Sequence, residues 1–398
     1  MKRKNALSYS FFKSPDRESL AKKIFSSYYF GVYCNIISNY LKKHNINSRV
    51  VYLDFFAGKG KYDTGEESVP LNVIRSFCAF RNCFLYFNDL HNSSILKKNI
   101  EEKIKEIGVK IDYKVDSKDA SDIDVRELFS PNDIVLSYID SFSVRMCEPE
   151  KIALLTKNNF SDCIVFVNCE HIYRHIDNPG NESGLFLKFF GSEDNLIKIQ
   201  EIYRTSSTKN EATIEMLKNY VERLKEASGS CLYVLPIFFK KSHQDTNYSQ
   251  MVLVVSKNTL GINRIRERFA EIDDTKNNIG EINQDFYLEN NHMVVYENRE
   301  RGKTSLFEED NIKYKYLLKY LPSFKDGPLN AKELLQKIDK DFYFENGYCS
   351  GYSEKIIKNA LKHFEDNDII KVIHSGNRKR INQSFGELTK VYKNENNN

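Results

Sequence analysis

The stretch "VVYLDFFAGKGKYDTG", residues 50–65, decides how this sequence is expected to fold. Its first four residues are β-branched, aromatic or aliphatic, which predicts a buried strand. The residues 54–60 contain an acid and two glycines, which predicts a turn that leaves the carboxyl end of this strand. In an open α/β sheet, ligands bind at that end of the strands, so the rest of the chain should show whether such a sheet follows.

Strand-like and helical segments alternate after this opening stretch. The four further strands are expected at residues 83–89, 110–117, 133–140 and 162–169, and helical segments separate them. Strands that alternate with helices predict a parallel, doubly wound sheet, here a Rossmann-like α/β fold. After a mostly helical stretch at about 184–226, apolar runs at 230–241 and 249–258 are too close for a parallel crossover. They predict a terminal antiparallel hairpin, and a parallel sheet that ends so is the arrangement of class I methyltransferases.

Composition shifts predict the organisation of the chain. Apolar residues at helical spacing before the first strand predict one or two helices that pack on the sheet. The last part contains three short helical patterns and a strand, turn and strand around Ser375-Gly376-Asn377, which predicts a winged-helix-like α+β module. The expected parts are N-terminal helices (1–48), a methyltransferase-like domain (49–270), a linker or irregular loop (271–310), the winged-helix-like module (311–390) and a disordered tail (391–398).

Charge and cysteine content limit the class of protein. The 398 residues carry a formal net charge of only +4, so nucleic-acid binding would have to come from a local patch. The eight cysteines are scattered without a CxxC pair, which indicates buried thiols in a reducing compartment, the cytoplasm. Cys163, Cys169 and His171 come closest to a metal-ligand set, but packing on alternate faces of one strand explains them more simply. No apolar run reaches the length of a membrane span.

The glycine-broken turn has the features of a cofactor site. S-adenosylmethionine has a charged amino-acid end, two ribose hydroxyls and an adenine, and each requires a different partner. The turn of Phe56, Ala57, Gly58 and Gly60 would let the backbone approach the methionine end, because glycines lack a Cβ and adopt positive φ. Asp54 at the end of the strand could bind the ammonium group directly or through water.

Three more acids are expected at the ends of the next strands. Asp89 is placed to accept both ribose hydroxyls, Asp116 lies near the expected adenine edge, and Asp140 lies where the reacting atoms would meet. Each acid alone could be a helix cap or a surface charge. Because the carboxyl ends of parallel strands meet at one edge of the sheet, together they indicate a site.

These motifs resemble those of the three-Cys-motif partner proteins, a bacterial family similar to S-adenosylmethionine-dependent methyltransferases. The segment "LDFFAGKGKYDTGEESVPL" is similar to the family's Asp-x-Phe-Ala-Gly-x-Gly-x-Tyr stretch with its following Ser-Pro-Leu step, although Val69 here separates the serine and the proline. The segments "FND", "VDSKDA" and "YID" and the tail extend the resemblance. It implies the cofactor S-adenosyl-L-methionine and a partner similar to radical S-adenosylmethionine enzymes, which carries the three cysteines.

The chain departs from this family after the fourth strand. The family tends to have Asp-Pro-aromatic-Gly there, whereas this chain has Asp140-Ser141-Phe142-Ser143. The resemblance implies that Asp140 and Phe142 are held against the target amine or ring, and the loss of proline and glycine loosens that geometry. The departure therefore concerns catalysis more than cofactor binding.

Two further groups of residues have alternative interpretations. Arg378, Lys379 and Arg380 follow the expected wing turn, where they could bind phosphates, although basic turns also occur on solvated hairpins and winged helices also dock proteins. The residues His171, Tyr173 and His175 follow the fifth strand, where they could line the acceptor pocket or merely begin a surface helix.

Three functions compete on this evidence. The first is an S-adenosylmethionine-dependent methyltransferase-like protein that acts with a partner protein on an unknown acceptor. The second is a non-catalytic adaptor, in which the methyltransferase-like domain is a scaffold and the winged helix docks nucleic acid or protein. A nuclease is disfavoured, because the strand-end carboxylates lack a paired Asp/Glu-x-Lys motif.

Overall fold

The computed structural model describes residues 17–178, 180–230, 232–240, 247–275, 284–289, 292–297, 316–323, 325–374 and 389–394. The chain divides into two compact units. The first comprises Met1–Val234 and Thr246–Ile262, and the second comprises Leu235–Asp245 and Asn263–Asn398.

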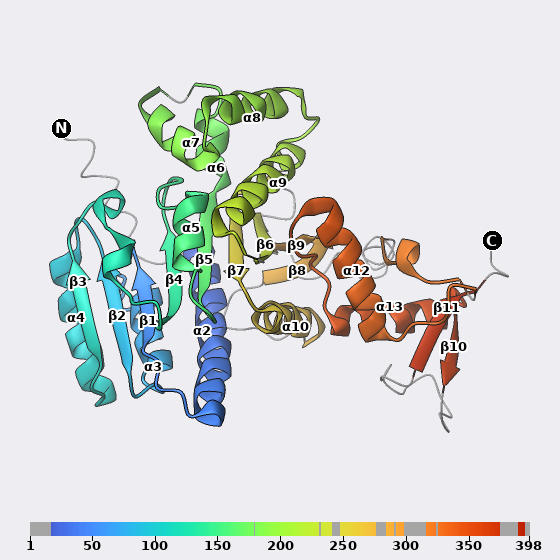
Figure 1. Ribbon diagram of the computed structural model, residues 1–398, viewed down its shortest axis with the longest axis horizontal. Coiled ribbons are helices and arrows are strands. Elements are labelled where there is room, and N and C mark those ends of the chain that lie inside the picture. Colours follow the sequence, from blue (N-terminus) through green and yellow to red (C-terminus); the bar gives the residue numbers. More distant parts are fainter. Residues whose placement is uncertain are drawn as a thin grey trace. The chain divides into compact units, whose positions relative to one another are not determined.

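A mostly parallel sheet forms the centre of the first unit (Figure 1). Its strands are β1 (Val50–Asp54), β2 (Cys83–Asn88), β3 (Asp112–Asp116), β4 (Ile134–Asp140), β5 (Asp162–Asn168) and β7 (Gln250–Ser256). They lie in the order β3-β2-β1-β4-β5-β7, followed by β6 (Tyr233–Lys240). The first five strands pair in parallel, and β7 runs antiparallel to β5. This confirms the predicted Rossmann-like sheet with its terminal hairpin, and the reversal of order at β1 and β4 creates the crevice where such sheets bind ligands.

Aromatic side chains attach the N-terminal helix to the sheet. In the described residues before β1, the helix α2 (Arg17–His44) neighbours α3 (Val69–Phe77), which in turn neighbours α4 (Ser93–Ile107). The Phe30 ring of α2 lies 5.5 Å from the ring of Tyr52 in β1 and 6.1 Å from that of Tyr138 in β4. All three side chains are buried, so α2 covers the face of the sheet on which Tyr52 and Tyr138 lie.

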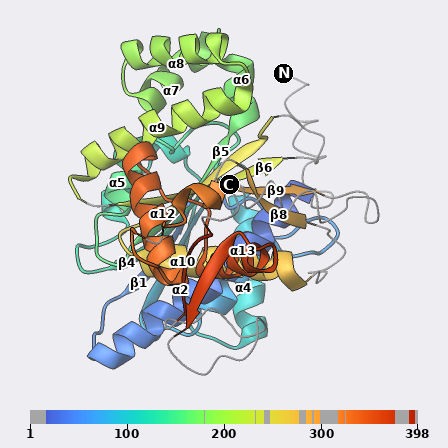
Figure 2. The ribbon, with the colours of Figure 1, turned by 90° about the vertical axis from the view of Figure 1, so that its right-hand side faces the viewer.

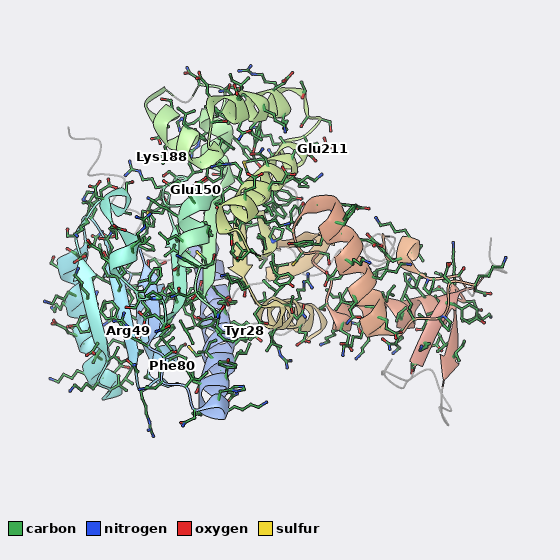
Figure 3. The ribbon with its side chains drawn as sticks, viewed as in Figure 1. Tyr28, Arg49, Phe80, Glu150, Lys188 and Glu211 are labelled. Atoms are coloured by element: carbon green, nitrogen blue, oxygen red, sulfur yellow. The ribbon has the colours of Figure 1, made fainter. Side chains whose placement is uncertain are left out.

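A second group of helices follows the central strands. It consists of α5 (Pro149–Leu155), α6 (Cys169–His175), α7 (Ser183–Phe190), α8 (Glu193–Thr205) and α9 (Lys209–Ser228). The last three confirm the helical stretch predicted there, and α7, α8 and α9 pack in sequence (Figure 2). Glu150 of α5, labelled in Figure 3, accepts a hydrogen bond from Arg223 Nη2 of α9 at 2.6 Å.

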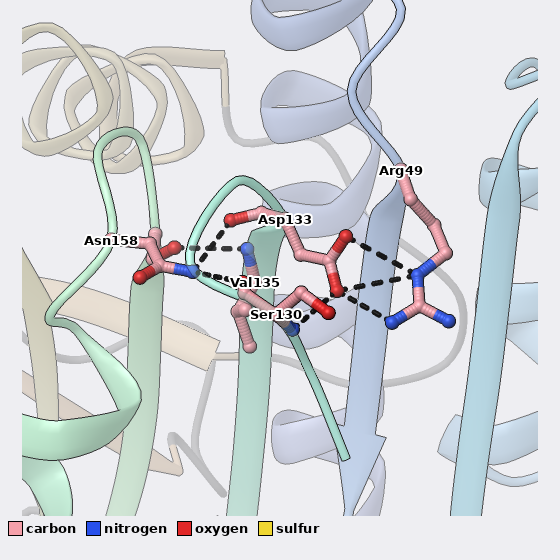
Figure 4. Close-up of polar contacts among 6 residues, drawn as sticks. Arg49, Ser130, Asp133, Val135 and Asn158 are labelled. Carbon is pink, nitrogen blue, oxygen red and sulfur yellow. Dashed lines mark hydrogen bonds and ion pairs between the residues drawn. The ribbon is translucent and has the colours of Figure 1, made fainter. Parts of the chain in front are cut away.

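A partly buried network holds the amino ends of the central strands together (Figure 4). Arg49, which precedes β1, donates from Nη2 to Asp133 Oδ2 at 2.5 Å, and Asp133 immediately precedes β4. The same oxygen accepts the N–H of Ser130 at 2.7 Å. Asn158 Nδ2 donates to the carbonyl oxygens of Ser130 and Asp133 at 2.8 and 2.9 Å. These contacts lie at the end of the sheet opposite the predicted site.

We expect the Asp133→Ala substitution to lower the free energy of unfolding by about 2 kcal/mol, because hydrogen bonds to a charged group contribute about 1.5–3 kcal/mol. Removal of the carboxylate leaves Arg49 and the Ser130 N–H without this acceptor. Urea unfolding measures the change. Asp122→Ala on the exposed surface is the control, and it should change the free energy by less than about 0.5 kcal/mol. Equal effects of the two substitutions would contradict a stabilising role of the network.

The second unit contains two strands where a linker or irregular loop was expected. β9 (His292–Glu297) pairs in parallel with residues 237–240 of β6, and β8 (Gln284–Glu289) pairs antiparallel with β9. Each strand has a short aromatic or β-branched run, such as "DFYLE" or "MVVY", between polar flanks. The polar flanks concealed this strand propensity, and pairing with β6 supplies the long-range contact that stabilises it.

The C-terminal elements confirm two of the three predicted helices, α12 (Ala331–Asn346) and α13 (Glu354–Asp366). The described part of the first predicted helix is the 3₁₀ turn η4 (Tyr316–Tyr320). The other elements are α10 (Thr259–Thr275), which was not predicted, and the strands β10 (Ile370–His374) and β11 (Thr389–Lys393). β10 and β11 pair antiparallel, with His374 opposite Thr389. The predicted returning strand, residues 378–385, lies outside the described residues, and β11 extends into the stretch expected to be a disordered tail. The winged-helix assignment stays a prediction.

A buried ion pair links α10 and α12 within the second unit. Arg266 is 1% exposed, and it donates from Nη1 and Nη2 to Asp339 at 2.8 and 3.0 Å. Ser350 Oγ also donates to Asp339, at 2.8 Å. Among the described helices, none has the length and hydropathy needed to cross a membrane.

Candidate functional site

The glycine turn follows β1 in the conformation that the sequence predicted. Gly58 has a φ of 65° and Gly60 a φ of 81°, a region that residues with a Cβ rarely adopt. The Gly58 N–H donates to Asp89 Oδ2 at 3.0 Å, and the Ala57 N–H donates to the Asn88 carbonyl oxygen at 3.0 Å. The turn is thus hydrogen-bonded to the carboxyl end of β2, as a ligand site across strand ends requires.

Asp54 ends β1 as a nearly inaccessible acid. Its residue is 1% exposed, and its carboxyl group accepts hydrogen bonds from the Phe56 N–H at 3.1 Å and the Tyr52 hydroxyl at 3.3 Å. Burial, together with the negative charges of Asp140 and Asp89, raises the pKa of Asp54 to about 8, although the hydrogen bonds from the Phe56 N–H and the Tyr52 hydroxyl oppose the rise. Burial therefore favours the neutral form of this carboxyl group.

Asp89 lies one residue beyond the end of β2, and its two carboxylate oxygens accept hydrogen bonds from different segments. Its Oδ2 accepts the Gly58 N–H, and its Oδ1 accepts the N–H groups of His91 and Asn92 at 3.0 and 2.7 Å. Asn92 is the N-cap of α4. One carboxylate thus connects the glycine turn to the start of α4.

Asn88, which the sequence interpretation overlooked, is the residue that ends β2. It is 1% exposed, and its Nδ2 donates to the carbonyl oxygens of Phe55 and Lys118 at 3.2 and 3.0 Å. Its Oδ1 accepts the Lys118 N–H at 3.0 Å. Asn88 therefore joins the segments that follow β1 and β3, and an amide directly after the apolar run "CFLYF" was the available signal.

Asp116 ends β3 on the same edge of the sheet. Its Oδ2 accepts hydrogen bonds from Tyr86 Oη at 3.1 Å and from Lys114 Nζ at 2.8 Å. Its carbonyl oxygen accepts the Asp89 N–H at 3.2 Å. The structure therefore brings Asp116 next to Asp89, as the prediction of a shared edge requires.

Asp140 ends β4 and pairs with a lysine from the N-terminal helix. Lys22 Nζ lies 2.8 Å from Asp140 Oδ1, and the two side chains are 12% and 25% exposed. Lys22 Nζ also lies 5.2 Å from the centre of the Phe166 ring in β5. No feature of the sequence indicated this lysine, because it precedes Asp140 by 118 residues.

The turn after β4 holds Phe142 on the surface. Phe142 is 67% exposed, and its carbonyl oxygen accepts a hydrogen bond from Asn168 Nδ2 of β5 at 3.2 Å. Ser141 Oγ accepts a hydrogen bond from the Ser143 N–H at 3.2 Å. A serine hydroxyl therefore stabilises this turn, which lacks the proline and glycine of the family's motif. Phe142 therefore lies at the surface near the carboxyl end of β4.

The residues that follow β5 have different surroundings, although the rings of His171 and His175 lie 4.8 Å apart. The Tyr173 hydroxyl lies 2.8 Å from Thr213 Oγ1 of α9, so it contributes to helix packing. His171 is 8% exposed and its ring is stacked 5.9 Å from that of Phe186, which leaves its role in an acceptor pocket a prediction. Within the described ranges, no group of three or more histidines, cysteines and acids could hold a metal ion. Arg378, Lys379 and Arg380 lie outside the described residues.

Comparisons with known proteins found structural but not sequence similarity. No family model and no curated protein sequence matches the chain. A geranyl diphosphate methyltransferase solved with GPP and sinefungin is similar over 56% of this chain and 78% of its own, at 10% identity and a TM-score of 0.24. A putative S-adenosyl-L-methionine-dependent methyltransferase from Methanococcus maripaludis is similar over 60% and 92%, at 11% identity and a TM-score of 0.25.

The O-methyltransferase TomG from Streptomyces achromogenes, solved with SAM, is also similar. The match covers 65% of this chain and 100% of that protein, at 12% identity and a TM-score of 0.26. All three TM-scores are below 0.5, so we interpret the site from its own residues. The candidate site consists of the glycine turn, the buried Asp54 and the acids at the ends of neighbouring strands.

Proposed function

We propose that this chain is an S-adenosylmethionine-dependent methyltransferase-like protein that acts with a partner protein. The observation that carries the proposal is the hydrogen-bonded turn between β1 and β2, in which two glycines adopt positive φ beside a buried acid. The strand order places this turn where open α/β sheets bind ligands.

The residues at this edge fit the chemical groups of the cofactor. Gly58 and Gly60 would allow the methionine end to approach the backbone, and Asp54 would bind its ammonium group. Asp89 Oδ1 already accepts hydrogen bonds from His91 and Asn92, whereas its Oδ2 accepts the Gly58 N–H and can accept a further hydrogen bond from a ribose hydroxyl. Asp116 would lie at the adenine edge. The cofactor would supply an electrophilic methyl group for transfer to a nucleophile.

The ion pair at the end of β4 determines what Asp140 can do for the acceptor. Lys22 Nζ donates to Asp140 Oδ1, and Asp140 Oδ2 can accept a hydrogen bond from an amine or hydroxyl. Such a bond would direct the lone pair of the nucleophile towards the methyl group and remove its proton as the charge develops. Phe142 would contact the flat part of an acceptor.

A non-catalytic adaptor is the second candidate, and the Lys22–Asp140 pair also favours it. In an adaptor this pair would be a structural link between α2 and β4, and the C-terminal module would dock nucleic acid or protein. The resemblance noted above supports a partner similar to radical S-adenosylmethionine enzymes. Arg378, Lys379 and Arg380 are the residues that we propose for contacts with phosphates.

Calorimetric titration with S-adenosylmethionine and its demethylated product tests the proposed function. Binding of one molecule per chain is expected. Absence of binding by the unmodified protein would exclude the methyltransferase and leave the adaptor.

Cofactor affinity should increase with pH, because Asp54 has a pKa of about 8. Below that pH the group is protonated, and the ammonium group favours its ionised form, so binding should release a proton. The dissociation constant should then fall about tenfold per pH unit, or about 100-fold from pH 5.5 to 7.5. The α-amino group of the ligand, with an ordinary pKa near 8, stays mostly cationic over this interval.

Calorimetry in two buffers of different ionisation enthalpy measures the released proton. Asp54→Asn is the control variant, and its affinity should not change with pH over the same interval. A dissociation constant of the unmodified protein that is independent of pH would show that Asp54 is already ionised, or that it does not meet the ammonium group.

A further inference from the structure

The loop that contains the glycine turn lies along α4. Residues 58–68 connect the turn to α3, and Asn99 in the middle of α4 donates from Nδ2 to the Lys59 carbonyl oxygen at 2.7 Å. A Cβ on Gly60 would lie 3.2 Å from Leu96 Cδ1 of the same helix. The backbone of the turn thus approaches α4 as closely as side-chain packing permits.

A fully buried lysine holds the far end of this loop. The side chain of Lys103 is 0% exposed, and its Nζ lies 2.7 Å from Glu67 Oε1 in the loop and 2.8 Å from Glu106 Oε1 in α4. Glu67 forms a backbone bridge with Lys61, so the ion pair acts on both sides of the loop. A buried ammonium group is costly unless it is paired, and here its partners fix the position of the loop.

The start of α4 is held by the same acid that binds the turn. Asp89 accepts N–H groups from Asn92 at the N-cap and from Gly58 in the turn. Contacts with Asp89, Asn99 and Lys103 are therefore distributed along the loop, from its first residues to Glu67. Asn99 and Lys103 both belong to α4, so the helix fixes the spacing of these two contacts.

We propose that Asn99 and Lys103 are positioning residues that hold the glycine loop in the shape that receives the amino-acid end of the cofactor. This inference rests on the proposed function. Neither residue touches the cofactor in this proposal. Both act through the backbone and side chains of the loop, and their role is to pre-organise the turn.

The variants Asn99→Ala and Asn99→Asp test the proposal. Asn99→Asp keeps the size of the side chain but replaces the amide donor by an acceptor that faces a carbonyl oxygen. Lys97→Ala on the exposed face of α4 is the control. In the ligand-free protein, hydrogen exchange of residues 56–62 should be about tenfold faster in both Asn99 variants and unchanged in the control. Lys103→Met should accelerate exchange around Glu67.

Ligand binding distinguishes positioning from a general loss of structure. S-adenosylhomocysteine carries the amino-acid end, whereas 5′-methylthioadenosine lacks it. Asn99→Ala should weaken binding of the first about tenfold and of the second less than twofold. Equal weakening of both ligands, or unchanged exchange in residues 56–62, would overturn the inference. If the unmodified protein bound neither ligand, the proposed function would be wrong, and the exchange data would still show whether Asn99 holds the loop.

Discussion

Gly58→Val should eliminate measurable binding of S-adenosylmethionine and its demethylated product while the fold stays intact. Gly58 has a φ of 65°, and a β-branched residue in this conformation is strained by about 1–3 kcal/mol. Relief of the strain would move the N–H away from Asp89 Oδ2, and the new side chain would stand where the backbone must approach the ligand. We expect affinity to fall about 1,000-fold, which corresponds to about 4 kcal/mol.

Gly65→Val is a matched control for the effect of backbone strain. Gly65 has a φ of 85°, and a Cβ at this position meets no heavy atom within 4 Å among its described surroundings. The substitution brings similar strain at the other end of the loop, away from the turn beside Asp89. Calorimetry should show affinity within a few fold of the unmodified protein. Equal loss in both variants, or full affinity of Gly58→Val, would contradict the proposed cofactor site.

Asp140→Asn should separate turnover from binding. Asn keeps the shape and one acceptor oxygen of the side chain but removes the charge that pairs with Lys22. Because the positioned acid would orient the nucleophile and accept its proton, turnover should fall by about 10²–10⁴, whereas cofactor affinity should stay within a few fold. Asp89→Ala should have the opposite pattern, with its main effect on affinity.

Turnover can be measured without a known acceptor. The protein is incubated with S-adenosylmethionine that carries a labelled methyl group and with an extract of cells that lack the gene, and the label transferred to the extract is measured. Fractionation of the labelled product then identifies the acceptor class. Full activity of Asp140→Asn would limit Asp140 to a structural link with α2. Tight cofactor binding without any transfer by the unmodified protein, even with a candidate partner added, would favour the adaptor.

Short-range patterns in the sequence determined the sheet and the edge at which the candidate site lies. The apolar run of β1, the following acid and the two glycines act within a few residues, so their structure could be predicted locally. The same holds for the strand-end acids Asp116 and Asp140, because strand direction alone places them at one edge. β8 and β9 were missed, since their short runs become strands by pairing with β6.

The tertiary structure decided which lysines pair with the acids of the candidate site and of its loop. Lys22 meets Asp140 across 118 residues of sequence, and Lys103 meets Glu67 across 36. No local pattern encodes such pairs, because their distance depends on how α2 and α4 pack on the strands. The elevated pKa of Asp54 likewise results from burial beneath the folded edge of the sheet, so its identity was visible in the sequence but its protonation state was not.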